Sequence, residues 1–263
     1  MTTTEQVRSN PVTESLVFAG RLFTHWRRQP TVPVQSLLFP TFLLITYYLL
    51  VGESVMNVTG QDSLYGLVPT CAVAGAMFGA LAACMNVWIE RDVGLLGRLW
   101  VLPVHRYSAL AGRLIAEAVR TLGASALITL VGVGLGLRFR GGWLDMALYL
   151  AVPVVVGVIF SAALIAIAVR TANSVALMWF AVPAISAVFA SSGSPPVELL
   201  PAGVRPLVEY QPMAATIGTM RALAHGDPAG WPMLLTAVWA VALAAVILPV
   251  AVYGYRAAAE NGP

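Results

Sequence analysis

The sequence contains no lysine: every one of its basic residues is an arginine. The common phosphate-binding loop, GxxxxGK[ST], uses its lysine to reach the phosphates of a nucleotide. The chain therefore has no such loop, and any ATP that its activity consumes must be hydrolysed by another polypeptide.

Charged residues in general are scarce. Asp, Glu, Lys and Arg make up 10% of the chain, hydrophobic residues make up 59%, and the mean hydropathy is +0.80. These values lie far outside those of an average soluble domain. The composition predicts an integral membrane protein.

Cysteine is sparse as well, and its placement excludes a disulfide. Cys71 and Cys84 lie in one apolar segment, and a helix would separate them by about 20 Å, which is far beyond disulfide reach. We expect both to be packing residues. Small residues four apart, at Gly75, Gly79 and Ala83, favour close helix packing in the same segment.

Six segments lack Asp, Glu and Arg altogether: 29–52, 63–89, 121–137, 146–169, 171–197 and 228–255. All but the third exceed the roughly 20 residues that cross a bilayer as a helix. The third reaches this length if its helix includes the preceding turns, where Arg113, Glu117 and Arg120 are spaced for pairing along one face. No segment alternates as the strands of a membrane barrel do. The predicted fold class is an all-α integral membrane protein with six transmembrane helices.

The arginines predict the orientation. With the N-terminus in the cytoplasm, the cytoplasmic segments hold eleven arginines and the outer segments four, as the positive-inside rule favours. We expect both termini on the cytoplasmic side of a plasma (inner) membrane. The chain then forms a single domain, with a leader (1–32), a six-helix bundle (33–255) and a cytoplasmic tail (256–263). No basic cluster on a soluble face indicates nucleic-acid binding.

The leader has an amphipathic pattern. From Val12 to Arg28, apolar residues recur near helical spacing with basic residues between them. This predicts a helix in the inner membrane interface, with its arginines toward anionic headgroups. The residues expected to hold it there are Arg21, Trp26, Arg27 and Arg28. The alternative is a solvated tail whose charges only set the topology.

The stretch from Glu90 to Arg106 is a charged segment between the second and third predicted helices, on the inner side. A short helix here can lie along the membrane and present Leu95, Leu96 and Trp100 to a partner, and Pro103 would end it. The alternative is an ordinary polar loop that Trp100 anchors at the interface.

The stretch from Pro195 to Leu223, before the last predicted helix, is too rich in proline and charge to span a membrane. It predicts a broken, partly re-entrant helical cap on the outer side. The alternative is a plain loop, although loops of this length usually have structure or function.

Other kinds of site find little support. No ionisable residue lies deep in a predicted span, which weakens an ion-coupled carrier. The histidines fall in loops or at interfaces, so they are not placed to bind a metal together. No Ser/His, Asp/Asp or HExxH arrangement indicates a membrane hydrolase. We therefore do not expect an enzyme.

The run RDVGLLGRLWVLPVHR, followed by SALAGRLIAEAVR, resembles the inner loop of ATP-binding-cassette (ABC) type 2 exporter permeases. It is most similar to the daunorubicin-resistance (Drr) permeases and their lipid-exporting relatives. In that family the loop forms a coupling helix that docks on the nucleotide-binding subunit. The resemblance implies this role for Glu90, Arg91, Asp92, Gly94, Leu95, Leu96, Arg98 and Pro103, and the loop's own pattern adds Trp100.

The likeness extends over nearly the whole chain. The leader helix resembles the family's interfacial connector, although it is poor in motif residues, and GLRFRGG at 136–142 resembles an outer turn. In the outer segment before the last helix, the matching residues are Pro201, Pro206, Gln211, Pro212 and Arg221.

The resemblance implies the transmembrane (permease) subunit of an ATP-driven exporter. Its cargo would be hydrophobic or amphipathic, either a drug or a complex cell-envelope lipid. It would work with an ABC ATPase that binds the ATP and Mg, with a second permease copy or a related permease, and with membrane lipid. The chain itself is expected to bind no cofactor. Two alternatives stay open: an ion-coupled secondary carrier and a non-transporting membrane assembly scaffold.

Overall fold

The computed structural model describes residues 10–28, 30–59, 62–94, 105, 107–171, 173–191, 203, 208 and 210–261. Within these ranges the chain forms helices and no strands, so the all-α prediction is confirmed for them. The helices are α1 (Pro11–Arg28), α2 (Thr31–Thr59), α3 (Leu64–Asp92), α5 (Ser108–Leu135), α6 (Trp143–Ala168), α7 (Val175–Phe189), α9 (Pro212–His225) and α10 (Gly230–Asn261).

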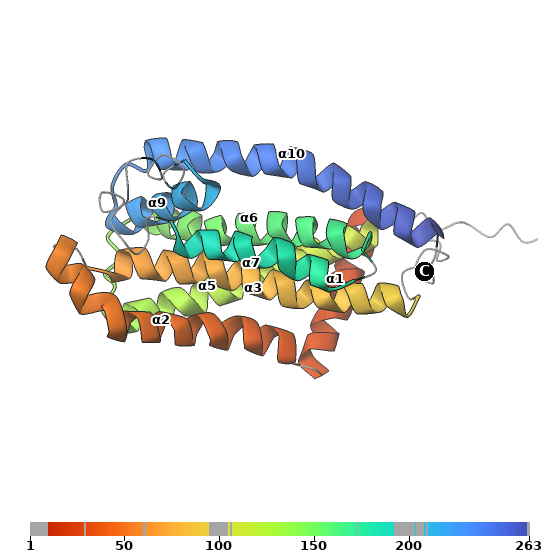
Figure 1. Ribbon diagram of the computed structural model, residues 1–263, viewed down its shortest axis with the longest axis horizontal. Helices are drawn as coiled ribbons and strands as arrows, with labels where there is room; N and C mark the ends of the chain where they lie inside the picture. The colour runs from red at the N-terminus through yellow and green to blue at the C-terminus, as the bar shows by residue number, and fades with distance from the viewer. Residues whose placement is uncertain are drawn as a thin grey trace, which may run out of the picture.

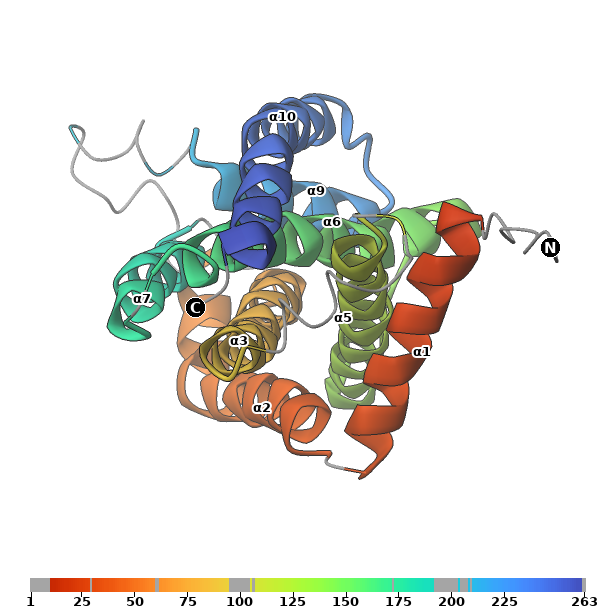
Figure 2. The same cartoon turned by 90° about the vertical axis from the view of Figure 1, so that its right-hand side faces the viewer.

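The long helices run side by side along the longest axis of the molecule (Figure 1). Helix α1 departs from this direction, because it lies across one end of the bundle, beside the end of α5 (Figure 2). We call this the α1 end; it also contains the last turn of α3 and the first turns of α5. We call the other end, where residues 136–142 meet the end of α9, the α9 end.

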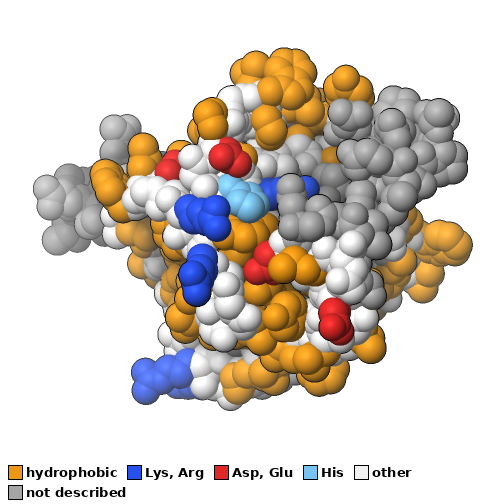
Figure 3. Space-filling view, turned by 90° about the vertical axis from the view of Figure 1, so that its left-hand side faces the viewer, with side chains coloured by type: hydrophobic (Ala, Val, Ile, Leu, Met, Phe, Trp, Pro, Cys, Tyr) orange, Lys and Arg blue, Asp and Glu red, His pale blue; other side chains and the backbone are white. Residues whose placement is uncertain are grey.

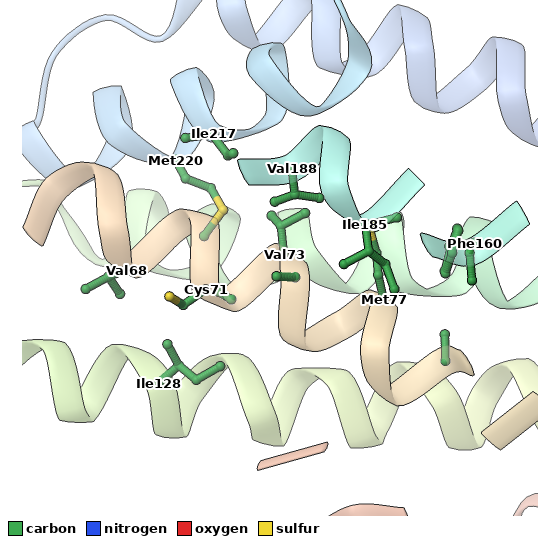
Figure 4. Close-up of a cluster of buried hydrophobic side chains, with 14 of the residues drawn as sticks. Val68, Cys71, Val73, Met77, Ile128, Phe160, Ile185, Val188, Ile217 and Met220 are labelled. Atoms are coloured by element: carbon green, nitrogen blue, oxygen red, sulfur yellow. The ribbon is translucent and has the colours of Figure 1, made fainter. Parts of the chain in front are cut away.

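Helix α3 is at the centre of the core. Almost every residue from Leu64 to Ala80 is buried, and α3 packs against α2, α5, α6, α7 and α9. Figure 4 shows Val68 and Met77 of α3 among Ile128 of α5, Val188 of α7 and Met220 of α9. The small residues of α3 permit this, because neighbouring helices can approach its backbone closely.

Two glycines mark these close approaches. A Cβ atom on Gly75 of α3 would lie 2.8 Å from the Pro40 ring of α2. A Cβ atom on Gly132 of α5 would lie 2.6 Å from Cγ2 of Val68. Both distances are shorter than packed carbon atoms allow, so these positions require glycine. The predicted small-residue packing is confirmed at Gly75, whereas Gly79 accommodates an arginine side chain, described below.

The helices coincide with the predicted segments, with two differences in length. Among the described residues, four helices are long and apolar enough to cross a membrane: Leu64–Asp92, Ser108–Leu135, Trp143–Ala168 and Gly230–Ala257. The apolar helical stretches Leu37–Leu50 and Val175–Phe189 are shorter. Helix α5 begins at Ser108 and so includes the turns before the charge-free segment 121–137, as expected, whereas α7 occupies only part of the segment 171–197.

At the α9 end, backbone groups are bonded between distant segments. The Arg140 N–H donates to the carbonyl of Ala224 at 2.9 Å, and the Tyr65 hydroxyl donates to the carbonyl of Arg138 at 2.6 Å. The ring of Tyr65 stacks on His225 with centroids 3.8 Å apart. Basic, acidic and histidine side chains are visible on this face among hydrophobic ones (Figure 3). These bonds fix the turn between α5 and α6 to the end of α9.

The close approach of α3 and α5 gives a stability prediction. We expect Gly132→Leu to lower the melting temperature of the detergent-purified protein, because overpacking typically costs about 1–3 kcal/mol. Gly134→Leu, two residues away on α5, is the control, since nothing lies within 4 Å of its Cβ position. Equal melting temperatures of the two variants would show that α3 and α5 are not held this closely.

Candidate functional site

Three groups of polar contacts connect α1, α3 and α5: two lie at the α1 end, and the third lies deeper in the bundle. The predicted coupling residues Leu95, Leu96, Arg98, Trp100 and Pro103 belong to the segment 95–104, which lies outside the described residues. The prediction of a coupling helix therefore rests on the sequence, and the structure describes the residues on either side of it.

Glu14 of α1 forms the first group of contacts. Its carboxylate accepts the backbone N–H of His105 and the hydroxyl of Ser108, both at 2.7 Å, and lies 3.2 Å from Nδ1 of His105. Glu14 is only 7% exposed although it is acidic, because α1 packs closely on α5. At Gly112 a Cβ atom would lie 2.7 Å from the Ser15 carbonyl oxygen, so this packing requires glycine. Glu14 thus fixes the start of α5 to α1.

An ion pair between Glu90 and Arg113 forms the second group. Glu90 lies in the last turns of α3, and Arg113 lies in the second turn of α5. Both side chains are mostly buried. The pair joins the two helices that lead into and out of the segment 95–104.

Glu117 and Arg120 of α5 form the third group. Nε of Arg120 donates to Oε2 of Glu117 at 3.0 Å, and Nη2 bonds Oε1 of Glu117 and the carbonyl of Ala76 on α3. The two side chains are 3% exposed or less. A Cβ atom on Gly79 would collide with the guanidinium, so α3 admits this side chain only because it has a glycine there.

The sequence identified part of this arrangement. The pairing of Glu117 with Arg120 is confirmed, but Arg113 pairs with Glu90 of α3 and not along its own helix. The expectation that no ionisable residue lies deep in a span stays a prediction, and Glu117 and Arg120 lie in the turns that the third predicted helix was expected to include. They lie about 14 and 18 Å from the start of α5, because that helix begins at Ser108.

The predicted coupling residues that the structure describes lie at the end of α3. Glu90, Arg91 and Asp92 form its last turn, and Nη1 of Arg91 donates to the carbonyl of Thr171, after α6, at 2.6 Å. Gly94 has a φ of 69°, the left-handed conformation in which glycine commonly ends a helix. The end of α3 is thereby bonded to both α5 and the turn between α6 and α7.

The predicted interfacial helix is confirmed as a helix, α1. Arg21, Arg27 and Arg28 are exposed, and Trp26 is half-buried with its ring at an edge contact to Phe23, 5.7 Å between centroids. Its position at a membrane surface stays a prediction.

In the outer segment, Pro201 and Pro206 lie outside the described residues. Nε2 of Gln211 donates to the carbonyl of Ala187 at the end of α7, at 3.3 Å. Pro212 is the first residue of α9, where its missing N–H costs no hydrogen bond, and Arg221 lies within α9. Gln211, Pro212 and Arg221 therefore lie near α7, α9 and α10, far from the α1 end.

Sequence reasoning did not single out Glu14, His105 or Ser108 as a cluster. The available signal was Glu14 itself, because a lone acid on an otherwise apolar and basic helix needs a partner. Its partners are more than 90 residues away along the chain, so local spacing could not identify them.

Comparison with known proteins assigns the chain to a family. Residues 14–224 match the model of the ABC-2 type transporter family. The chain belongs to this family. A "probable doxorubicin resistance ABC transporter permease protein DrrC" of Mycobacterium tuberculosis is 33% identical over 95% of this chain and 91% of its own length. A "daunorubicin resistance ABC transporter permease protein DrrB1" of Streptomyces coeruleorubidus is 23% identical over 95% of this chain and 88% of its own length.

These matches confirm the resemblance to the Drr permeases, and with it a multi-pass membrane permease. The family match includes α1, α3 and α5 and the segment between α3 and α5. The polar contacts at the α1 end therefore belong to an ABC-2 permease, and they hold both ends of its segment 95–104.

The contacts of Glu14 predict the behaviour of the first turn of α5. We expect Glu14→Ala to increase hydrogen–deuterium exchange there about tenfold or more, because hydrogen bonds to charged groups contribute roughly 1.5–3 kcal/mol. Thr13→Ala, at an exposed neighbouring position of α1, is the control. Unchanged exchange in Glu14→Ala would mean that α5 begins at Ser108 without help from α1.

The buried pair of Glu117 and Arg120 predicts non-additive stability. Glu117→Gln should be strongly destabilising, by about 3–5 kcal/mol, since it leaves the arginine charge buried without its partner. The double variant Glu117→Leu/Arg120→Met removes both charges and should unfold at a higher temperature than Glu117→Gln does. Thermal unfolding in detergent measures both variants, and a double variant less stable than Glu117→Gln would contradict the pairing.

Proposed function

We propose that this permease is the transmembrane subunit of an ATP-driven exporter of hydrophobic or amphipathic cargo. Its family supports this role, since its relatives are described as ABC transporter permeases of drug resistance. The ATP and Mg belong to a separate ABC ATPase, because this chain lacks the lysine of a phosphate-binding loop. The permease therefore has no ATPase site of its own and receives energy through contact.

In this proposal six helices cross the plasma membrane: α2, α3, α5, α6, α7 and α10. The α1 end is cytoplasmic, as the arginine distribution favours. The exposure of α1 fits this placement. Val12 and Val17, 61% and 67% exposed, point away from the bundle and can enter the membrane interface, while Glu14 and Ala19 face α5.

On the outer side, α9 and the beginning of α10 form a helical hairpin. Gly226, with a φ of 77°, ends α9, and Oγ1 of Thr219 lies 2.9 Å from Oγ1 of Thr236 on α10. Nε1 of Trp239 donates to the carbonyl of Tyr210 at 3.1 Å, about 13 Å along α10 from its start. This geometry supports a segment that enters the membrane partway and returns to the outer surface before α10.

The observation that carries the proposal is the attachment of both ends of the segment 95–104. The Glu90–Arg113 pair joins α3 to α5, and Glu14 joins α5 to α1. A partner that moves this segment would therefore move three helices together and would not merely bend a loop. In the assembly, two permease subunits, identical or related, would stand on two ATPase subunits and exchange inward-open and outward-open states.

The size of the required coupling indicates which residues contact the ATPase. Moving a two-state equilibrium from 1:99 to 99:1 takes about 5.5 kcal/mol of differential binding. Exposed ion pairs contribute about 0–1 kcal/mol each, whereas burying a large apolar side chain contributes roughly 1.5–3 kcal/mol. Leu95, Leu96 and Trp100 are therefore the proposed contacts, with Arg98 in a lesser role.

The two alternative functions, an ion-coupled carrier and an assembly scaffold, require different features of the chain. An ion-coupled carrier needs a carboxylate that an ion can reach, and Glu117 is buried and paired with Arg120. An assembly scaffold needs no ATPase contact. The presence or absence of an ATPase partner therefore separates an exporter from a scaffold.

We expect a gentle detergent pull-down from native membranes to recover an ABC ATPase subunit, and Leu95→Asp to lose it. The matched control is Leu144→Asp, an exposed leucine in the first turn of α6 at the other end of the bundle. In reconstituted vesicles, Leu95→Asp and Gly94→Pro should uncouple ATP hydrolysis from export more severely than Arg98→Ala.

Two results would contradict this proposal. If no ATPase is recovered under conditions that preserve other ABC complexes, the carrier and scaffold alternatives become the better explanations. If all three substitutions cause equal, mild losses of coupling, the segment 95–104 does not transmit the energy.

A further inference from the structure

A groove of about 470 Å³ lies between α6, α7, α9 and α10, separate from the cluster at the α1 end. It extends along α6 from Leu148 to Ala163 and along α10 from Met233 to Ile247. These stretches of helix are each about 21–22 Å long. The groove is therefore long and narrow, runs parallel to helices of membrane-crossing length, and has the volume of a small-molecule site.

The lining offers a ligand almost no hydrogen bonds. Its side chains are aliphatic, aromatic or methionine, apart from three threonines and the indole of Trp239. Thr216 already donates to the carbonyl of Pro212 at 2.8 Å, and Thr219 to that of Ala215 at 2.9 Å. Thr236 is bonded to Thr219, and the Trp239 N–H is bonded to Tyr210. A ligand group that must accept a hydrogen bond would therefore lose its water here without gaining a donor from these side chains.

The length and the lining of the groove decide which occupant it favours. A space that extends about 21 Å along α10 and offers no free hydrogen-bond donor suits a long, flexible apolar chain better than a molecule with polar substituents. An extended chain without branches fits a space of this shape.

We propose that this α6–α10 groove holds one alkyl chain of a membrane lipid. Lipid tails surround the spanning helices at this depth, and they carry no group that needs a hydrogen bond. Because the tails of the bilayer are as apolar as the lining, the chain is retained by close packing against four helices and not by a hydrophobic effect. The site belongs to the permease alone and requires neither ATP nor an ATPase.

The same lining disfavours the compounds in the names of the relatives. Doxorubicin and daunorubicin carry many polar groups on rigid rings, whereas the described threonines of the groove have no free donor and its other side chains are almost all apolar. The alkyl chain and the drug are therefore distinguishable by competition.

The test uses a phosphatidylcholine with a diazirine halfway along one acyl chain, added to the purified permease in detergent. We expect photo-crosslinks on α6 and α10 at the groove, and Ala240→Phe, which fills it, should reduce them at least about fivefold. Ala242→Phe is the matched control, because Ala242 is exposed on α10 but does not line the groove. An excess of ordinary phosphatidylcholine should compete, and doxorubicin should not.

A second variant that fills the groove from another helix distinguishes loss of the site from misfolding of a single variant. Ala151→Phe fills the groove from α6, where Ala151 is exposed, so the helix can accept the larger side chain. Only variants that elute as a single species and melt near the parent temperature are compared. Equal crosslinking in Ala240→Phe, Ala151→Phe and Ala242→Phe would overturn the proposal, and so would loss of the crosslinks with doxorubicin.

Discussion

The structure depends on pairing every charge that is placed between its helices. Glu117 and Arg120 are almost completely buried, about 14 and 18 Å from the start of α5. Isolated, each would cost several kcal/mol, so the pair determines how α3 must pack. The guanidinium fits against α3 because Gly79 has no side chain there, and it donates to the carbonyl of Ala76. The register between the two central helices follows from this one contact.

Because buried charges need partners, polar contacts are concentrated on one side of the bundle, around α5. Helix α5 is bound to α1 by Glu14, and to α3 by the Glu90–Arg113 pair and by the bond from Arg120 to the carbonyl of Ala76. On the side of α7, α9 and α10, the described contacts are mainly apolar, and α10 is exposed along most of its length. Hydrogen bonds and ion pairs with defined partners favour one arrangement, whereas packed apolar helices can shift by small sliding movements. We therefore expect the helices around α5 to move as a unit and α10 to move relative to them.

Patterns in the sequence predicted the features that depend on residues close together along the chain. Charge-free segments gave the helices, and the three-residue spacing of Glu117 and Arg120 gave their pairing. The same patterns failed where the partner is distant. Arg113 has Glu117 four residues later on its own helix, yet it pairs with Glu90, because the packing of α3 on α5 brings Glu90 within reach.

Helix α10 runs past both the α1 end and the α6–α10 groove, so its shape determines how a movement at one can affect the other. Near the α1 end, Nη2 of Arg170 donates to the carbonyl of Val250, while Ala240, ten residues earlier, lines the groove. Pro249 lies between them, and a proline removes one backbone hydrogen bond and permits a bend. A displacement at the α1 end can therefore tilt one half of α10 without breaking its contacts in the other. The width of the groove would then depend on the angle at Pro249, so an alkyl chain in the groove would favour one angle over the other.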